Sequence, residues 1–177
     1  LDADDLEPRP PQWIVRNFIE KDVLGSFFGA SESGKSFLAI DLSLCVASGA
    51  PFAGCSVVQE GLVCYIAGEG ASGIKNRLAA WCKSRDIPRK GLPFVLSNQS
   101  ADMLDDASVR KIIDRAEAAA ERHGVQPVLF VIDTLSRNFG AGDENSSQDM
   151  KTFKDGMDAL RLHFPGCTVL CVHHSGH

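Results

Sequence analysis

The chain contains the run Gly29-Ala30-Ser31-Glu32-Ser33-Gly34-Lys35-Ser36, which reads G-x-x-x-x-G-K-S and around which the other elements are arranged. This pattern is typical of a loop that binds phosphate groups, provided that it lies between a strand and a helix. The apolar run 23–28 before it predicts a buried strand, and the run 37–44 after it predicts a helix. The context therefore favours a phosphate-binding loop over a glycine-rich turn that binds nothing.

The residue types in this loop suit a polyphosphate ligand. Glycines let the chain curl so that backbone N–H groups point inward, and the following helix adds the positive end of its dipole. We expect all eight residues to line a nucleotide site, with Lys35 at the β and γ phosphates and the Ser36 hydroxyl on Mg²⁺. A carboxylate inside the loop would repel phosphate, so the Glu32 side chain should point outward to solvent.

The composition excludes several classes of protein. The chain has 177 residues, of which 44% are hydrophobic and 23% charged, which suits one globular domain with a real core. Its net charge of −5 gives no global basic field for nucleic acid or anionic membranes, although local basic loops remain compatible with it. No apolar run approaches the roughly 18 residues of a membrane-spanning helix, so no membrane partner is expected.

The cysteines indicate a reducing compartment. They form no C-x-x-C pair, and several lie in apolar runs, where a thiol behaves as a small hydrophobic group. We therefore expect reduced core cysteines in a cytoplasmic protein, with neither a disulfide set nor a zinc site. The six are Cys45, Cys55, Cys64, Cys82, Cys167 and Cys171.

Apolar runs separated by helical segments predict an α/β fold with a parallel sheet covered on both faces. Residues 1–20 are interpreted as an N-terminal lead-in and residues 21–177 as the domain, with Trp13-Ile14-Val15 at the edge of the sheet. After the first strand and helix, strands are expected at 62–67, 94–96, 128–133 and 167–172, and helices at 74–83, 105–122 and 149–164.

Acidic residues follow two of the predicted strands, at the edge where parallel sheets bind ligands. Asp133 ends an apolar strand. This is the position expected for an acid that holds Mg²⁺ directly or through water. The alternative for Asp133 is a helix N-cap. Glu69, between Gly68 and Gly70, is placed to polarise the water that attacks a γ phosphate, and the alternative is a solvated turn acid.

Two further pairs of polar residues lie at strand ends. His173 and His174 end the last strand, and by alternation one of them points to each face. One would touch the γ phosphate or the attacking water, and the alternative is a hydrogen-bonded histidine at the sheet edge. Arg137 and Asn138, just past Asp133, are interpreted as contacts to nucleotide or to a neighbouring subunit, with a plain surface role as the equal alternative.

With these motifs in view, the chain resembles the RecA-like ATPases, and most of all the RepA group of plasmid and phage replicative helicases. The phosphate loop is shared by many families, whereas the G-E-G strand end, the D-T-L-S-R run and the His-His end are together more specific. In family order the matching stretches are 29–36, 49–52, 65–70, 131–139 and 172–176.

The resemblance implies a three-layer RecA-like P-loop NTPase domain with strand order 3-2-4-5-1, counted from the strand before the phosphate loop. It also implies an ATPase with Mg²⁺ that drives a helicase along single-stranded DNA, as a homo-oligomeric ring, commonly a hexamer. The implied roles are general base for Glu69, phosphate and Mg²⁺ binding for Lys35, Ser36 and the Walker B acid Asp133, sensor for His174, and sensor or interface contact for Arg137 and His173.

This chain departs from the family in one respect, and two other functions remain open. RecA-like ATPases continue past the fifth strand with a DNA-contacting loop and an arginine finger that acts on the neighbour's nucleotide. We therefore expect the chain to be truncated on its C-terminal side and to turn over weakly alone, because charge supplied in trans strongly stabilises phosphoryl transfer. The alternatives are a regulatory or DNA-repair RecA-like ATPase without translocation and a non-catalytic nucleotide-dependent interaction module.

Overall fold

The computed structural model describes residues 10–68, 71–97 and 99–174, and its centre is a parallel sheet of five strands. The strands lie in the order β3-β7-β6-β4-β5, and every neighbouring pair is parallel. Read from β5 and counted along the chain, this is the order 3-2-4-5-1 that the family resemblance implies. The strands are β3 (Leu24–Gly29), β4 (Leu62–Ala67), β5 (Phe94–Ser97), β6 (Pro127–Asp133) and β7 (Thr168–His174).

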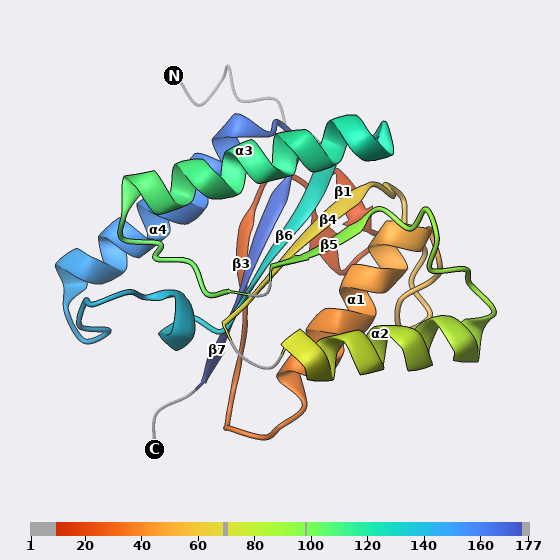
Figure 1. The fold of residues 1–177 in the computed structure, drawn as a ribbon, viewed down its shortest axis with the longest axis horizontal. Coiled ribbons are helices and arrows are strands. Elements are labelled where there is room, and N and C mark those ends of the chain that lie inside the picture. The colour runs from red at the N-terminus through yellow and green to blue at the C-terminus, as the bar shows by residue number, and fades with distance from the viewer. Residues whose placement is uncertain (1–9, 69–70, 98, 175–177) are drawn as a thin grey trace.

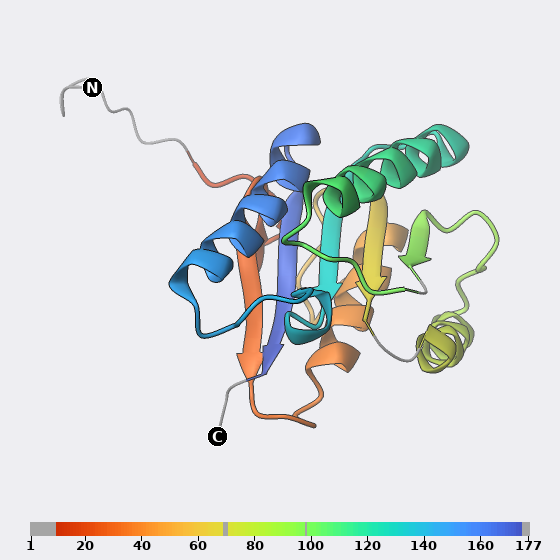
Figure 2. The ribbon, with the colours of Figure 1, turned by 60° about the vertical axis from the view of Figure 1, so that its left-hand side comes forward.

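Helices cover both faces of the sheet and make three layers (Figures 1 and 2). Helices α1 (Lys35–Ser48) and α2 (Ala71–Arg85) pack on one face, and α3 (Asp106–His123) and α4 (Ser147–His163) pack on the other. The central strands β4 and β6 are buried along their whole length, which explains their continuous apolar sequence. The predicted α/β fold is confirmed. Within the described ranges, none of the helices has the length and apolarity to span a membrane.

The helix ends follow the local signals in the sequence. Gly49 ends α1 with a φ of 72°, and Gly124 ends α3 with a φ of 69°, conformations that favour glycine. Asp105 caps the start of α3, where its side chain accepts hydrogen bonds from the backbone N–H groups of Ala107 and Ser108. These ends fix where the chain returns to the sheet.

The N-terminal run Trp13-Ile14-Val15 does not join the main sheet, so its predicted place at the sheet edge is wrong. It forms β1 (Trp13–Val15) and pairs antiparallel with β2 (Ile19–Glu20) in a separate hairpin. The Ile14 carbonyl also accepts the Val58 N–H at 2.7 Å, so the backbone groups of the run are used locally. The side chains of Ile14 and Val15 are buried in the core beneath α1.

The cysteines behave as core residues. All six are free thiols; Cys55 is half-buried and the other five are buried. Burial raises the pKa of Cys64 and of Cys171 to about 12. These thiols therefore stay protonated and pack as small hydrophobic groups.

Helix α4 packs closely against the chain before α3, and a glycine makes this approach feasible. A methyl group added at Gly156 would lie 2.5 Å from the carbonyl oxygen of Met103, which is backbone and cannot move aside easily. Gly156→Ala is therefore expected to lower the free energy of unfolding by about 1–3 kcal/mol, despite the higher helix propensity of alanine. Urea unfolding followed by circular dichroism measures this change.

A second glycine in a helix provides the matched control. No described atom lies within 4 Å of a methyl group added at Gly73 in α2. The effect of Gly73→Ala should thus depend on helix propensity alone. This variant should raise the free energy of unfolding by up to about 1 kcal/mol. Equal shifts of the same sign in the two variants would contradict the close packing at Gly156.

Candidate functional site

The register of the parallel strands gathers the predicted site residues at one edge of the sheet. Gly29 at the end of β3 pairs with His174 on β7, and Asp133 at the end of β6 lies between Val172 on β7 and Ala67 on β4. The phosphate loop, Asp133 and His174 are therefore adjacent although they lie far apart in the sequence. This is the edge at which parallel α/β sheets bind ligands.

The phosphate loop encloses its own lysine. Lys35 is only 8% exposed, and its Nζ donates hydrogen bonds to the carbonyl oxygens of Gly29 (2.8 Å) and Ala30 (2.5 Å) and to the Ser33 hydroxyl (3.3 Å). Glu32, by contrast, is exposed, as its charge predicts. The ammonium group is thus held where a phosphate would enter, by neutral acceptors that a phosphate can replace.

The start of helix α1 is open toward the loop. Its N-cap is Gly34, with a φ of 85°, and no described side chain accepts a hydrogen bond from the first turn. The first N–H groups of a helix have no partner within the helix, and they carry its positive dipole end. Loop and helix together can bind a polyphosphate.

Asp133 connects two other elements of the site. Its Oδ1 accepts a hydrogen bond from the Ser36 hydroxyl at 3.1 Å, and its Oδ2 accepts one from the Tyr65 hydroxyl at 2.5 Å. Asp133 as a residue is 8% exposed, and its peptide bond to Thr134 is cis. A carboxylate and a hydroxyl are the hard oxygen ligands that Mg²⁺ prefers, so this pair fits the predicted metal site.

The two histidines of β7 point to opposite faces. His174 alternates with Val172 and Leu170, which belong to the core on the α1 face, and its Nδ1 is buried without a hydrogen-bond partner among the described residues. The His173 ring instead packs against Phe28, with 5.3 Å between ring centroids. Because a buried unpaired nitrogen is costly, His174 is the better candidate for a ligand contact.

The end of β4 is bound to the end of β6. The Gly68 N–H donates to the Asp133 carbonyl at 2.6 Å, and a methyl group on Gly68 would overlap the Cβ of Arg137. The predicted general base, Glu69, lies outside the described residues, as does Gly70. Gly68, the last described residue before them, lies beside Asp133 and Arg137 at this edge of the sheet.

Of the two polar residues after Asp133, one is exposed and one is structural. Arg137 is exposed on the short helix η2 (Ser136–Asn138). Asn138 is fully buried; its Oδ1 accepts the Ala101 N–H and its Nδ2 donates to the Thr134 carbonyl, both at 2.8 Å. The predicted contact of Asn138 with nucleotide or a neighbouring subunit is therefore wrong, because its amide is used inside the domain.

A groove of about 790 Å³ continues from the phosphate loop between α1 and α2. Its wall includes Phe37, which is 60% exposed, and the Arg77 guanidinium lies 3.8 Å above the centre of the Phe37 ring. Trp81 also lines the groove and donates from Nε1 to Asp41 at 2.6 Å. An exposed apolar side chain at this place was predictable from the sequence, since Phe37 and Leu38 are adjacent in a helix and cannot both face the core.

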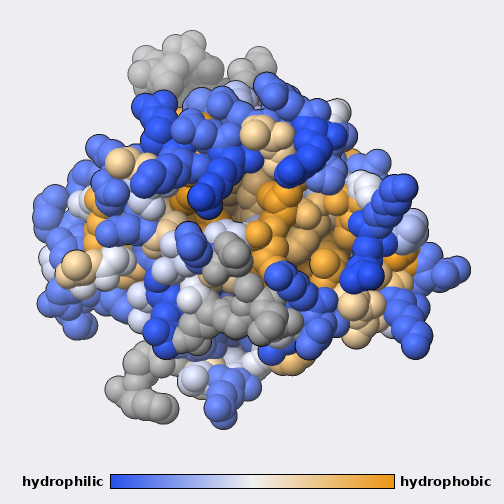
Figure 3. Space-filling view, in the orientation of Figure 1, coloured by the Kyte–Doolittle hydropathy of each residue, from blue (hydrophilic) through white to orange (hydrophobic). Residues whose placement is uncertain are grey.

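A second hollow, of about 630 Å³, lies on the opposite face of the sheet beneath α3 (Figure 3). Apolar side chains of β5 and α3 form its floor, and Lys111, Arg115 and Arg122 lie at its border. None of the phosphate-loop residues lines it. The groove beside the loop is therefore the candidate that belongs to the phosphate site.

Sequence reasoning also missed Tyr65 as a member of the site. Within β4, which reads Leu62-Val63-Cys64-Tyr65-Ile66-Ala67, it carries the only hydroxyl group. By the alternation of strand residues its side chain lies on the same face as Ala67, which pairs with Asp133. Recognising the contact required the register of two strands 68 residues apart in sequence.

One comparison with known protein families bears on this geometry. A family model described as an AAA domain matches residues 1–177, which is the whole chain. The match implies a P-loop ATPase, in agreement with the loop, helix and acid described above.

Proposed function

Because this chain belongs to the AAA domain family of P-loop ATPases, we propose that it binds ATP at residues 29–36 and hydrolyses it in a Mg²⁺-dependent reaction. The observation that carries the proposal is the hydrogen bond of 3.1 Å between Ser36 at the start of α1 and Asp133 at the end of β6. It brings the two predicted metal ligands together beside the buried Lys35 ammonium. Release of phosphate from ATP by the purified chain, with Mg²⁺ and with excess EDTA, tests the proposal; equal release would contradict it.

The side chains of this site have separate tasks in the proposed reaction. Lys35 exchanges its carbonyl partners for phosphate oxygens, and the open N-terminus of α1 binds the same phosphates. Ser36 and Asp133 would hold Mg²⁺, which neutralises negative charge on the phosphate oxygens when bound. His174 donates or accepts at the γ phosphate through its buried nitrogen. Glu69 is proposed as the general base on its position in the sequence directly after Gly68.

The groove between α1 and α2 is proposed to hold the nucleoside, with the base against Phe37 and Arg77. Aromatic stacking contributes about 1–3 kcal/mol per base, so Phe37→Ala should weaken ADP binding by roughly tenfold, measured by calorimetry. Leu162→Ala is the control, because this side chain is also exposed (68%) but lies on α4 across the sheet. Unchanged ADP affinity in Phe37→Ala would place the base elsewhere.

The finer proposal is the motor of a RepA-like replicative helicase that acts on single-stranded DNA as a ring, with Arg137 and His173 as sensor or interface residues. It is supported by the ordered motif set of the sequence. Phosphate release stimulated by single-stranded DNA, together with ATP-dependent assembly in gel filtration, tests it. Neither stimulation nor assembly is expected from the non-catalytic interaction module.

The second candidate is a regulatory or repair ATPase that changes state without translocation. The same catalytic residues would serve both functions, so these residues do not distinguish them. Strand displacement on a forked DNA substrate separates them, since hydrolysis without unwinding supports the regulatory function.

A further inference from the structure

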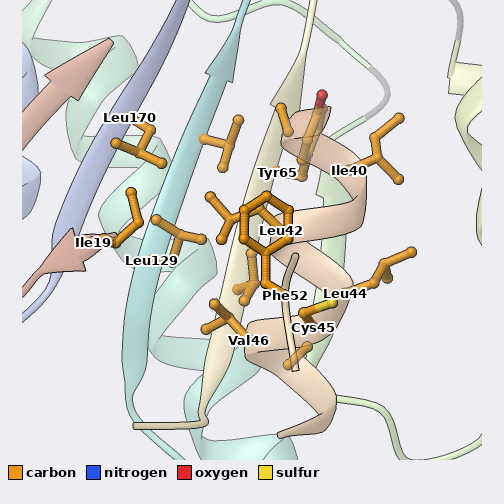
Figure 4. Close-up of a cluster of buried hydrophobic side chains, with 14 of the residues drawn as sticks. Ile19, Ile40, Leu42, Leu44, Cys45, Val46, Phe52, Tyr65, Leu129 and Leu170 are labelled. Carbon is orange, nitrogen blue, oxygen red and sulfur yellow. The ribbon is translucent and has the colours of Figure 1, made fainter. Parts of the chain in front are cut away.

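Tyr65 is a buried phenol with one specific polar contact. Its side chain is fully buried, and its hydroxyl donates to Oδ2 of Asp133 at 2.5 Å. Figure 4 shows the ring among apolar side chains between β4 and α1, with its oxygen at one end of the cluster. The strand register explains the contact, because Ala67 pairs with Asp133 and Tyr65 lies two residues earlier on the same face.

Packing alone does not account for the hydroxyl at this position. A phenylalanine would fill the same apolar space, whereas a hydroxyl must be hydrogen-bonded there to offset its desolvation. The Tyr65 hydroxyl has one proton to donate, and it donates it to Oδ2 of Asp133.

The carboxylate of Asp133 has different partners on its two oxygens. Oδ2 accepts a hydrogen bond from the Tyr65 hydroxyl, and Oδ1 accepts one from the Ser36 hydroxyl. Ser36 is the residue whose hydroxyl would bind Mg²⁺ in the proposed function. Oδ1 is thus the oxygen that lies beside the Ser36 hydroxyl, and the Tyr65 hydroxyl holds the other oxygen of the carboxylate.

We propose that Tyr65 is a positioning residue that holds Oδ2 of Asp133 so that Oδ1 is presented to Mg²⁺ beside Ser36. The inference rests on the proposed function, since it concerns the same nucleotide site. Partners that orient a metal ligand in this way typically contribute 10- to 100-fold to metal affinity.

The Mg²⁺ dependence of nucleotide binding tests this role. In Tyr65→Phe, the Mg²⁺ concentration that gives half of the Mg²⁺-induced gain in affinity for a fluorescent ADP should rise by about tenfold or more. ADP affinity in excess EDTA should stay the same, because the loop and Lys35 are unchanged. A half-effective Mg²⁺ concentration equal to that of the wild type would overturn the inference.

Thr168→Val is the matched control for a lost buried hydroxyl. Thr168 is fully buried, and its hydroxyl donates to the Glu20 carbonyl at 2.6 Å, at the opposite end of β7 from His174. If Tyr65 acts only through stability, both variants should lower the unfolding midpoint and leave the Mg²⁺ dependence unchanged. The inference requires that only Tyr65→Phe changes the Mg²⁺ dependence.

A measurement on the wild-type chain needs no variant at position 65. Tyr65 is the only tyrosine of the chain, so labelling tyrosine with ¹³C at Cζ gives one NMR signal. That signal should shift when Mg²⁺ is added to the ADP-bound protein, and the Mg²⁺-dependent part of the shift should be absent in Asp133→Asn. A signal that does not respond to Mg²⁺ in the wild type would overturn the inference.

These outcomes separate the inference from the proposed function. If wild-type ADP binding does not respond to Mg²⁺, the proposed metal site is wrong and the role of Tyr65 falls with it. If the wild type responds and Tyr65→Phe responds equally, the proposed function stands and only the inference is wrong.

Discussion

Lys35→Ala should lower the affinity for Mg²⁺·ADP by about a hundredfold and lower phosphate release from ATP by a factor of about 10²–10³. Lys35 carries the only positive side chain within residues 29–36, and its ammonium is almost fully buried there. The variant loses the charge that pairs with the phosphates. It also leaves the Gly29 and Ala30 carbonyls without the hydrogen bonds that they accept from Lys35. Calorimetric titration with Mg²⁺·ADP and a phosphate-release assay measure the two effects.

Lys151→Ala is the control for removing one lysine charge. Lys151 lies on α4 and is largely exposed, where it pairs with Asp155 four residues along the helix. Such exposed pairs contribute little to stability, so this variant should bind Mg²⁺·ADP like the wild type. Equal binding in Lys35→Ala and Lys151→Ala would mean that residues 29–36 do not form the phosphate site.

Asp133→Asn should separate nucleotide binding from hydrolysis. The amide keeps the shape of the carboxylate but removes the charge that would hold Mg²⁺, so phosphate release should fall by about 10²–10³. ADP affinity in excess EDTA should not fall in the same way. Without its negative charge, residue 133 no longer repels the phosphates, so the variant should bind ADP at least as well as the wild type. A phosphate-release assay measures the loss of hydrolysis, and ADP titration in EDTA measures the retained or increased affinity.

Asp155→Asn removes an equal charge on the exposed face of α4 and serves as the control. Its phosphate release and its ADP affinity should match those of the wild type. If Asp133→Asn weakens ADP binding in EDTA as strongly as it lowers hydrolysis, the carboxylate acts on the fold of the loop. The assignment of Asp133 to Mg²⁺ would then be wrong.

Much of the fold follows from local sequence. Strands β4 and β6 are buried on both faces and therefore read as continuous apolar runs. The ends of α1 and α3 are marked by glycines that adopt positive φ. The hairpin of β1 and β2 was not predictable in this way, because an apolar run of three residues does not reveal which backbone it pairs with.

The site was predictable only in part, because its contacts join residues far apart in the sequence. The phosphate loop and Asp133 are recognisable since each has a local pattern. Tyr65 reads as an ordinary strand residue until the register of β4 and β6 places it beside Asp133. Asn138 lies in a polar run that reads as surface, and its burial depends on the chain near Ala101.

Residues 29–36 and Asp133 are proposed to form one Mg²⁺-dependent ATP site. Calorimetric titration of the wild-type chain with ADP, in Mg²⁺ and in excess EDTA, is the decisive measurement because binding does not depend on turnover. One nucleotide should bind per chain, with an affinity that Mg²⁺ increases. Absence of binding in both conditions, or an affinity that Mg²⁺ does not change, would contradict it.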